Sequence, residues 1–325
     1  MQAINYKMIV IDSESHSLLL IDGETNEILS ELSYPREYTP TDIVLNKDSS
    51  IAYVPTVGTK KEHVIFKISI KDFKMSLDIL PITVPYPFQF ALEERENKSS
   101  AYIAEPNGSL YRVDLGNFNI TKLALPLNKV SCVGLATSNN LIFSAFEHSA
   151  GGTLTAFDYE GSISFQYDIP SIPTNIVITK KGKLIIPFTN TAFTGEGIAI
   201  FEAALDVVKA PKVITLQCPS CPNALSFYPC HAAITPNDKT AYIVAEDSAS
   251  ILVVDLDLGI IKDRLVIGRS ISRLYLIADT SFAIATSYLF SDLCLIDLRN
   301  GQLTATSSND RQFLSSIAIL NEKTI

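Results

Sequence analysis

The alternation of apolar and polar residues is clearest between positions 233 and 268. This stretch reads AITPNDKTAYIVAEDSASILVVDLDLGIIKDRLVIG, which is an apolar strand, a polar turn, an Ala-Tyr strand, a loop, an apolar run ending in Asp, a Gly turn and a last strand. Weaker copies recur along the chain at a spacing of about 40 to 46 residues, which is typical of four-stranded propeller blades. The pattern therefore predicts an all-β repeat protein. One short segment, EAALDVV from Glu202, has helical spacing instead.

Aligning the copies on the turn before their second strand predicts seven innermost strands. These strands begin at Asp42, Gln89, Cys132, Asn175, His231, Arg273 and Ser316. The last, SIAILNE, is C-terminal, whereas the strand expected beside it, KMIVIDS, is N-terminal. We expect these two to pair, because closing the ring removes exposed sheet edges. The predicted fold is a single domain over residues 1–325, a seven-bladed β-propeller of four-stranded antiparallel blades.

Five of the third strands end in aspartate just before a turn. These residues are Asp22, Asp114, Asp158, Asp255 and Asp297. Equivalent positions around a ring would allow a circle of carboxylates with a binding role. The favoured interpretation is local, because aspartate accepts hydrogen bonds from backbone N–H groups of a tight turn and glycine supplies the positive φ.

The repeat at 233–268 resembles that of the YVTN-type β-propellers of bacteria and archaea. The similarity is weaker over residues 39–72 and 100–114 and poor over 141–206. This family is in turn similar to the seven-bladed β-subunit group of quinoprotein amine dehydrogenases. The resemblance implies the fold more strongly than any activity, because one fold serves many functions. It suggests surface-layer proteins, binding modules, subunits of redox enzymes and a related lactonase group as functional classes.

Composition and charge exclude some classes of binding partner. Hydrophobic residues make up 47% and charged residues 19% of the 325 positions, which fits a chain with a large core. The net charge of −9 and the lack of a Lys/Arg cluster argue against nucleic acid as a partner. No apolar stretch is long enough for a membrane span. The start, MQAINYKMIVIDSESH, shows no signal-peptide pattern, so we expect a cytoplasmic protein, or an exported one if a leader has been removed.

The residues that open the innermost strands form the first candidate site, at the mouth of the central channel. All seven are polar or reactive: Asp42, Gln89, Cys132, Asn175, His231, Arg273 and Ser316. They predict a ligand site, although water in the channel would also explain a polar lining. The loops of the same face carry further rim candidates, Tyr86, Glu105, Glu147, His148, Tyr228 and Glu246. Such an acidic and aromatic rim suits a cationic ligand or a basic peptide, unless these side chains are only solvated.

An irregular insert at about residues 207–230 separates blades five and six. It contains Cys218, Cys221 and Cys230, and His231 follows directly. Thiolates and imidazole could bind zinc or an iron–sulfur cluster, so a metal site is one prediction. The alternatives are a structural disulfide, inert thiols or a redox-active pair. Adjacent Cys230 and His231 argue against a shared metal, because consecutive strand residues point to opposite faces.

No enzyme motif is present elsewhere in the sequence. There is no G-x-S-x-G, H-E-x-x-H, P-loop or dinucleotide fingerprint. The sequence therefore favours a propeller that binds a partner protein, a peptide or a small ligand at its channel face, without a resident cofactor. The alternative is an enzyme or enzyme subunit at the same face, either lactonase- or lyase-like or similar to amine dehydrogenase, with His231 as a base or a ligand. A structural surface array is a third hypothesis.

Overall fold

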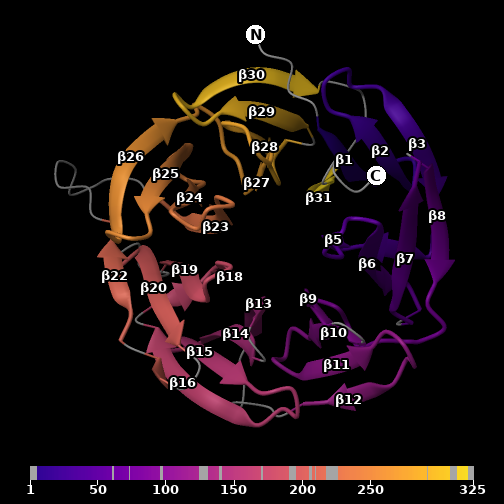
Figure 1. Cartoon of the computed structure of the whole chain (residues 1–325), viewed down its shortest axis with the longest axis horizontal. Helices are drawn as coiled ribbons and strands as arrows, with labels where there is room; N and C mark the ends of the chain where they lie inside the picture. The colour runs from indigo at the N-terminus through magenta and orange to yellow at the C-terminus, as the bar shows by residue number, and fades with distance from the viewer. Residues whose placement is uncertain are drawn as a thin grey trace.

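Seven β-sheets form a ring around a central axis in the computed structural model (Figure 1). The structure describes residues 6–60, 62–72, 74–95, 98–123, 131–138, 141–169, 171–189, 195–204, 207–208, 210–216, 226–290, 292–307 and 313–320. Within these ranges the chain contains strands and no helix. The predicted all-β, seven-bladed propeller of antiparallel blades is confirmed.

The first three blades follow one another around the ring. Blade 1 holds β1 (Lys7–Asp12), β2 (Ser17–Asp22), β3 (Ile28–Ser33) and the C-terminal β31 (Phe313–Leu320). Blade 2 holds β4 (Tyr38–Pro40), β5 (Val44–Leu45), β6 (Ile51–Gly58), β7 (Val64–Lys71) and β8 (Lys74–Ile79). Blade 3 holds β9 (Gln89–Arg95), β10 (Lys98–Ala104), β11 (Leu110–Asp114) and β12 (Ile120–Lys122).

The next two blades contain the least regular part of the chain. Blade 4 holds β13 (Ser131–Ser138), β14 (Leu141–His148), β15 (Gly151–Phe157) and β16 (Ile163–Ile169). Blade 5 holds β17 (Ile172–Pro173), β18 (Val177–Ile178), β19 (Lys183–Thr189), β20 (Gly197–Ala204), β21 (Val207–Val208) and β22 (Lys212–Thr215). The helical spacing noted from Glu202 was misleading, because Glu202, Ala203 and Ala204 continue β20, and the two alanines pair with β21.

The last two blades complete the ring. Blade 6 holds β23 (Pro229–Ile234), β24 (Thr240–Ala245), β25 (Ser250–Asp255) and β26 (Ile260–Val266). Blade 7 holds β27 (Arg273–Leu276), β28 (Phe282–Thr286), β29 (Leu293–Asp297) and β30 (Gln302–Ser307). The repeat that was clearest in the sequence is therefore blade 6.

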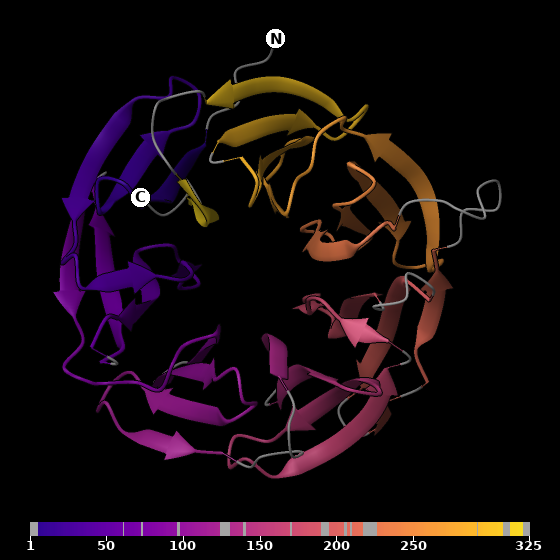
Figure 2. The ribbon, with the colours of Figure 1, turned by 180° about the vertical axis from the view of Figure 1, so that it is seen from behind.

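The two ends of the described chain meet in blade 1. The C-terminal β31 pairs antiparallel with β1, with Lys7 opposite Leu320 and Val10 opposite Ile317. Seen from behind, the yellow C-terminal strand lies beside the indigo strands of the N-terminal blade (Figure 2). The predicted closure of the ring is confirmed.

The core consists of layers between adjacent blades. The described residues contain seven apolar clusters, one at each blade–blade contact. Because successive strand residues point to opposite faces, β25 sends Ile251 towards blade 7 and Leu252 towards blade 5. Both side chains are buried, at 0% and 2% exposure. Middle strands covered on both faces therefore need continuous apolar runs, as in ILVVD.

The aspartates that end the third strands hold turns. Oδ1 of Asp255 accepts hydrogen bonds from the N–H groups of Asp257 and Leu258, both at 2.8 Å. Oδ1 of Asp22 likewise accepts hydrogen bonds from the N–H groups of Glu24 and Thr25, at 3.0 and 3.1 Å. The turn interpretation is therefore confirmed for these positions, and no ring of carboxylates has to be invoked.

A Pro-Thr-Asx segment interrupts the innermost strand in blades 2 and 5. In blade 5 the N–H of Thr174 donates to the carbonyl of Pro187 at 3.0 Å, and its hydroxyl donates to the carbonyl of Pro229 in blade 6. Thr41 in blade 2 likewise donates to Pro55 and, at 3.4 Å, to Pro87 of blade 3. These bonds fix neighbouring blades to each other at the end of the channel where the candidate site lies.

Candidate functional site

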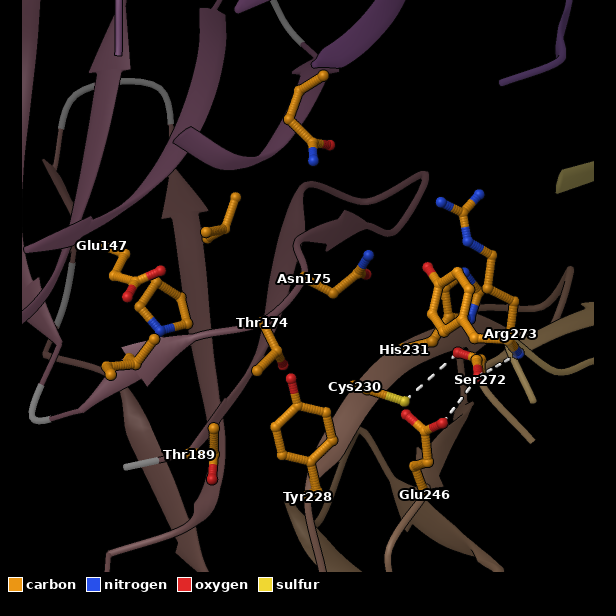
Figure 3. Close-up of a pocket in the computed structure, with 15 residues that line it drawn as sticks. Glu147, Thr174, Asn175, Thr189, Tyr228, Cys230, His231, Glu246, Ser272 and Arg273 are labelled. Atoms are coloured by element: carbon orange, nitrogen blue, oxygen red, sulfur yellow. Dashed lines mark hydrogen bonds between the residues drawn. The ribbon is translucent and has the colours of Figure 1, made fainter. Parts of the chain in front are cut away.

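A cavity of about 670 Å³ lies against the innermost strands of blades 3 to 7. Figure 3 shows that its labelled side chains converge from several blades. The lining residues are Gln89, Val133, Glu147, Ile172, Pro173, Thr174, Asn175, Thr189, Tyr228, Cys230, His231, Glu246, Ser272, Arg273 and Tyr288. Its size and mixed polar and apolar lining are those of a small-molecule site.

Four of the seven residues predicted at the channel mouth line this cavity, namely Gln89, Asn175, His231 and Arg273. Asp42 lies beside it as the partner of Arg273, and Ser316 is in turn the partner of Asp42. Oδ1 of Asp42 is 3.6 Å from Nη1 of Arg273 and also accepts a hydrogen bond from the Ser316 hydroxyl. This group joins blades 7, 2 and 1 across the site of ring closure.

Cys132 does not lie at the mouth. It is fully buried in the apolar cluster between blades 3 and 4, where its thiol contacts the carbonyl of Gly134 at 3.4 Å. A β-bulge between Cys132 and Gly134 shifts the register, so Val133 faces the cavity instead. The alignment of repeats assumed a regular strand here, and that assumption was wrong.

The predicted rim divides into two groups. Glu147, Tyr228 and Glu246 line the cavity. Tyr86, Glu105 and His148 lie outside its lining and have local partners. Tyr86 packs edge-on against His63 at 5.2 Å, Glu105 accepts a hydrogen bond from Tyr111 at 3.0 Å, and His148 Nε2 lies 3.1 Å from the Thr153 hydroxyl.

His231 is held as a neutral ring. Its Nδ1 accepts a hydrogen bond from the N–H of Leu274 at 3.4 Å, and the ring lies 6.0 Å from that of Tyr275. Burial and the positive charge of Arg273 lower the pKa of His231 from its ordinary 6.5 to about 3. The neutral ring then carries its proton on Nε2, which makes it a hydrogen-bond donor.

This environment makes stability depend on pH. Because the folded pKa of His231 lies below its unfolded value, the unfolded chain binds the extra proton. His231 therefore does not lower the free energy of unfolding above about pH 6.5. As the pH falls from 6.5 towards 3, this free energy decreases by at most about 1.4 kcal/mol per pH unit. We expect a His231→Gln variant to lose this part of the pH dependence of Tm, measured by calorimetry. An NMR titration midpoint for His231 near 6.5 would contradict the prediction.

Ser272 connects Glu246 to the backbone of Tyr288 on one side of the cavity. Its hydroxyl donates to Oε1 of Glu246 at 2.9 Å (Figure 3). The same hydroxyl accepts a hydrogen bond from the N–H of Tyr288 at 3.1 Å. The Ser270 hydroxyl also donates to Glu246 Oε1, at 3.2 Å. The sequence reasoning missed Ser272, because a serine before a strand is too common to mark a site.

Cys230 is a free thiol that lies next to Ser272 and Glu246. Its Sγ donates to the carbonyl of Ser272 at 3.4 Å, and burial together with Glu246 raises its pKa well above the ordinary range. A β-bulge between Pro229 and His231 places Cys230 and His231 on the same cavity, contrary to the expectation that they point apart. A protonated thiol is a poor metal ligand and a poor nucleophile.

The predicted metal site falls largely outside the described residues, because Cys218 and Cys221 lie there. In the ranges that the structure covers, no group of three or more His, Cys, Asp or Glu side chains is arranged to hold a metal ion. A zinc or iron–sulfur site at Cys218, Cys221 and Cys230 stays a prediction. The described chain also holds no helix long and apolar enough to cross a bilayer.

A buried glutamate positions Tyr228. Glu196 is 3% exposed, and its carboxyl group accepts hydrogen bonds from the N–H groups of Phe227 at 2.7 Å and Tyr228 at 3.2 Å. The hydroxyls of Thr189 and Ser226 donate to it as well. Tyr228 has a φ of 44°, a strained value for a bulky residue, so these contacts hold it in place. The motif Gly-Glu-Gly gave no signal, because most glutamates are exposed.

Comparisons with known proteins support the fold. No protein-family model matches the chain. No curated protein matches it either. Among solved structures, the periplasmic gluconolactonase of Pseudomonas aeruginosa is similar with a TM-score of 0.72 and 10% identity, over 98% of this chain and 99% of that one.

Two further solved structures resemble the chain. Hydrazine synthase of Kuenenia stuttgartiensis has a TM-score of 0.66 and 15% identity, over 87% of this chain and 89% of that one. Virginiamycin B lyase of Staphylococcus aureus has a TM-score of 0.59 and 14% identity, over 80% and 82%. At these identities the similarity defines the class, a seven-bladed β-propeller, and leaves the activity open.

Proposed function

We propose that the protein is a binding module that takes the cationic group of a small ligand or a peptide side chain into the channel cavity. The observation that carries this proposal is the charge of the lining. Glu147 and Glu246 both face the cavity, whereas Arg273, the one cationic side chain among its described lining residues, is paired with Asp42. The cavity therefore has an excess of negative charge.

The phenol rings support the same ligand class. Tyr228 and Tyr288 line the cavity beside Glu246 and are 38% and 66% exposed. Aromatic faces attract ammonium and guanidinium groups, and this attraction adds to that of a carboxylate. Asn175 and His231 also line the cavity, and their donors suit carbonyl or hydroxyl groups elsewhere on the ligand.

The chemistry of His231 favours binding over catalysis. A general base works best when its pKa is near the working pH, and the pKa of His231 is about 3. Its Nδ1 is also occupied by the N–H of Leu274. The alternative, an enzyme or enzyme subunit at the same cavity, takes its support from the structural similarity to a gluconolactonase and to a lyase.

Titration calorimetry with a matched pair of probes tests the proposal. Nα-acetyl-lysine methylamide should bind, and the uncharged norleucine analogue should bind at least about tenfold more weakly, since a charged hydrogen bond contributes about 1.5–3 kcal/mol. Glu147→Gln and Glu246→Gln should each weaken lysine-analogue binding by about ten- to a hundredfold. Glu160→Gln makes the same change of charge at an exposed turn residue and should leave binding unaltered.

The same protein preparations separate binding from catalysis. Glucono-1,5-lactone should be hydrolysed no faster with the protein than in buffer. Hydrolysis that is lost in His231→Gln would favour the enzyme alternative. Equal binding of the lysine and norleucine analogues would show that the carboxylates do not select the ligand.

The proposal also includes a family relationship and a cellular location. The kinship with YVTN-type propellers, and with it a bacterial source, rests on the repeat at residues 233–268 in blade 6. A cytoplasmic location is likewise part of the proposal, and fractionation of the native cell tests it. No resident cofactor is part of the proposed function.

A further inference from the structure

Three consecutive apolar side chains stand exposed beside the cavity. Tyr288, Leu289 and Phe290, here called the blade-7 step, are 66%, 72% and 46% exposed. They follow β28, in the connection to β29, and Tyr288 also lines the cavity. Single exposed apolar residues are common, but a contiguous group at the edge of a cavity marks an interaction surface.

The blade-7 step is rigidly held. At one end, the N–H of Tyr288 donates to the Ser272 hydroxyl, which itself donates to Glu246. At the other end, the guanidinium of Arg269 lies 4.4 Å from the ring centre of Phe290. Arg269 is fixed in turn by two hydrogen bonds to Asp292, at 2.9 and 2.8 Å. A surface fixed before binding loses little entropy when a partner docks.

Acidic residues adjoin the step. Glu246 lines the cavity below it, and the next residue, Asp247, is exposed. A membrane surface is therefore a poor partner, because anionic headgroups would meet these carboxylates on a chain of net charge −9. A small free amine would bind inside the cavity and would make no contact with Leu289 or Phe290.

We propose that the blade-7 step docks a polypeptide segment in which a lysine or arginine is flanked by large apolar residues. The basic side chain enters the cavity towards Glu246 and Glu147, and the apolar neighbours pack on Leu289 and Phe290. This inference rests on the proposed function and adds the partner class to it. Charge thus selects the central residue of the segment, and the step selects its neighbours.

Fluorescence anisotropy with a labelled peptide tests the step separately from the cavity. The probe is fluorescein-labelled Ala-Leu-Phe-Lys-Phe-Leu-Ala amide, and Nα-acetyl-lysine methylamide serves as the probe without flanking residues. Leu289→Ser should weaken peptide binding by about five- to twentyfold, because an apolar contact is lost. The same substitution should leave the affinity for the lysine analogue within about twofold of the wild-type value. Leu258→Ser, at a turn residue that is 57% exposed, is the matched control and should change neither affinity.

Each other result overturns the inference in a distinct way. If Leu289→Ser binds the peptide as tightly as the wild-type protein does, the step is no docking surface. If a peptide with norleucine in place of lysine binds equally well, the step acts without the cavity. Cosedimentation of the wild-type protein, but not Leu289→Ser, with phosphatidylserine vesicles would make the step a membrane contact. If neither the lysine analogue nor the peptide binds, the proposed function itself has failed.

Discussion

Deletion of residues 311–325 is expected to abolish the cooperative folding of the whole ring. The deletion removes β31, which supplies the innermost strand of blade 1 and pairs with β1. Ile317, Ala318 and Leu320 are 2%, 5% and 4% exposed and pack in the clusters on both sides of that blade. Burial of an Ile or Leu side chain contributes about 1.5–3 kcal/mol. The total loss is therefore a large part of the roughly 5–15 kcal/mol that stabilises a typical protein.

Differential scanning calorimetry measures this effect directly. The deleted protein should show no cooperative transition, or one that is displaced far below that of the complete chain, and its newly open β1 edge should promote aggregation. A chain that ends after Leu320 keeps β31 and is the matched control, with an expected Tm equal to that of the full sequence. An unchanged Tm after deletion of residues 311–325 would mean that β31 does not close the ring.

Glu196→Ala is expected to cost about 3–5 kcal/mol of unfolding free energy, because it leaves buried donors without an acceptor. Four groups donate to this carboxyl group in the native structure, two N–H groups from Phe227 and Tyr228 and two hydroxyls from Thr189 and Ser226. For a chain of this size the Tm should decrease by about 4–7 °C. Tyr228 loses the contacts that hold its backbone at positive φ, so affinity for the lysine analogue should decrease as well.

Glu202→Ala provides the matched comparison. Glu202 lies on β20, the strand that begins directly after Glu196, but is exposed, and removal of its side chain should change the unfolding free energy by less than about 0.5 kcal/mol. Thermal denaturation and titration calorimetry on both variants measure the two effects. If Glu196→Ala is as stable as Glu202→Ala, the hydrogen bonds to Glu196 contribute nothing to stability.

The period of the repeat predicted the residues that open regular strands, but it did not predict what an irregularity does to the residues beside it. Gln89 and Arg273 open strands of regular register, and both reach the cavity. His231 reaches it although it follows the bulge in β23, and Asn175 reaches it from the break between β17 and β18. Cys132 occupies the corresponding place in the aligned sequence, but the bulge in β13 turns it into the core. A bulge inserts one residue and reverses the facing of its neighbours, and no composition signal marks it in advance.

The remaining site residues depend on contacts between distant parts of the chain. Glu196 is separated from Tyr228 by 32 positions, and Asp42 from Ser316 by 274. Nothing local in the sequence distinguishes Glu196 from an exposed turn glutamate. Its role arises because blade 5 and the start of blade 6 approach each other closely enough to bury it.

The sequence by itself determined the architecture of this protein, namely the strand pattern, the number of blades and the closure by the C-terminal strand. These features follow from local periodicity, since a strand covered on both faces must be apolar throughout and each turn needs particular residues. Only the tertiary structure decided which polar groups share the cavity, that Arg273 is neutralised by Asp42, and that the blade-7 step adjoins Glu246. Charge balance and accessibility depend on the packing of five different blades, and they are properties of that packing rather than of any one repeat.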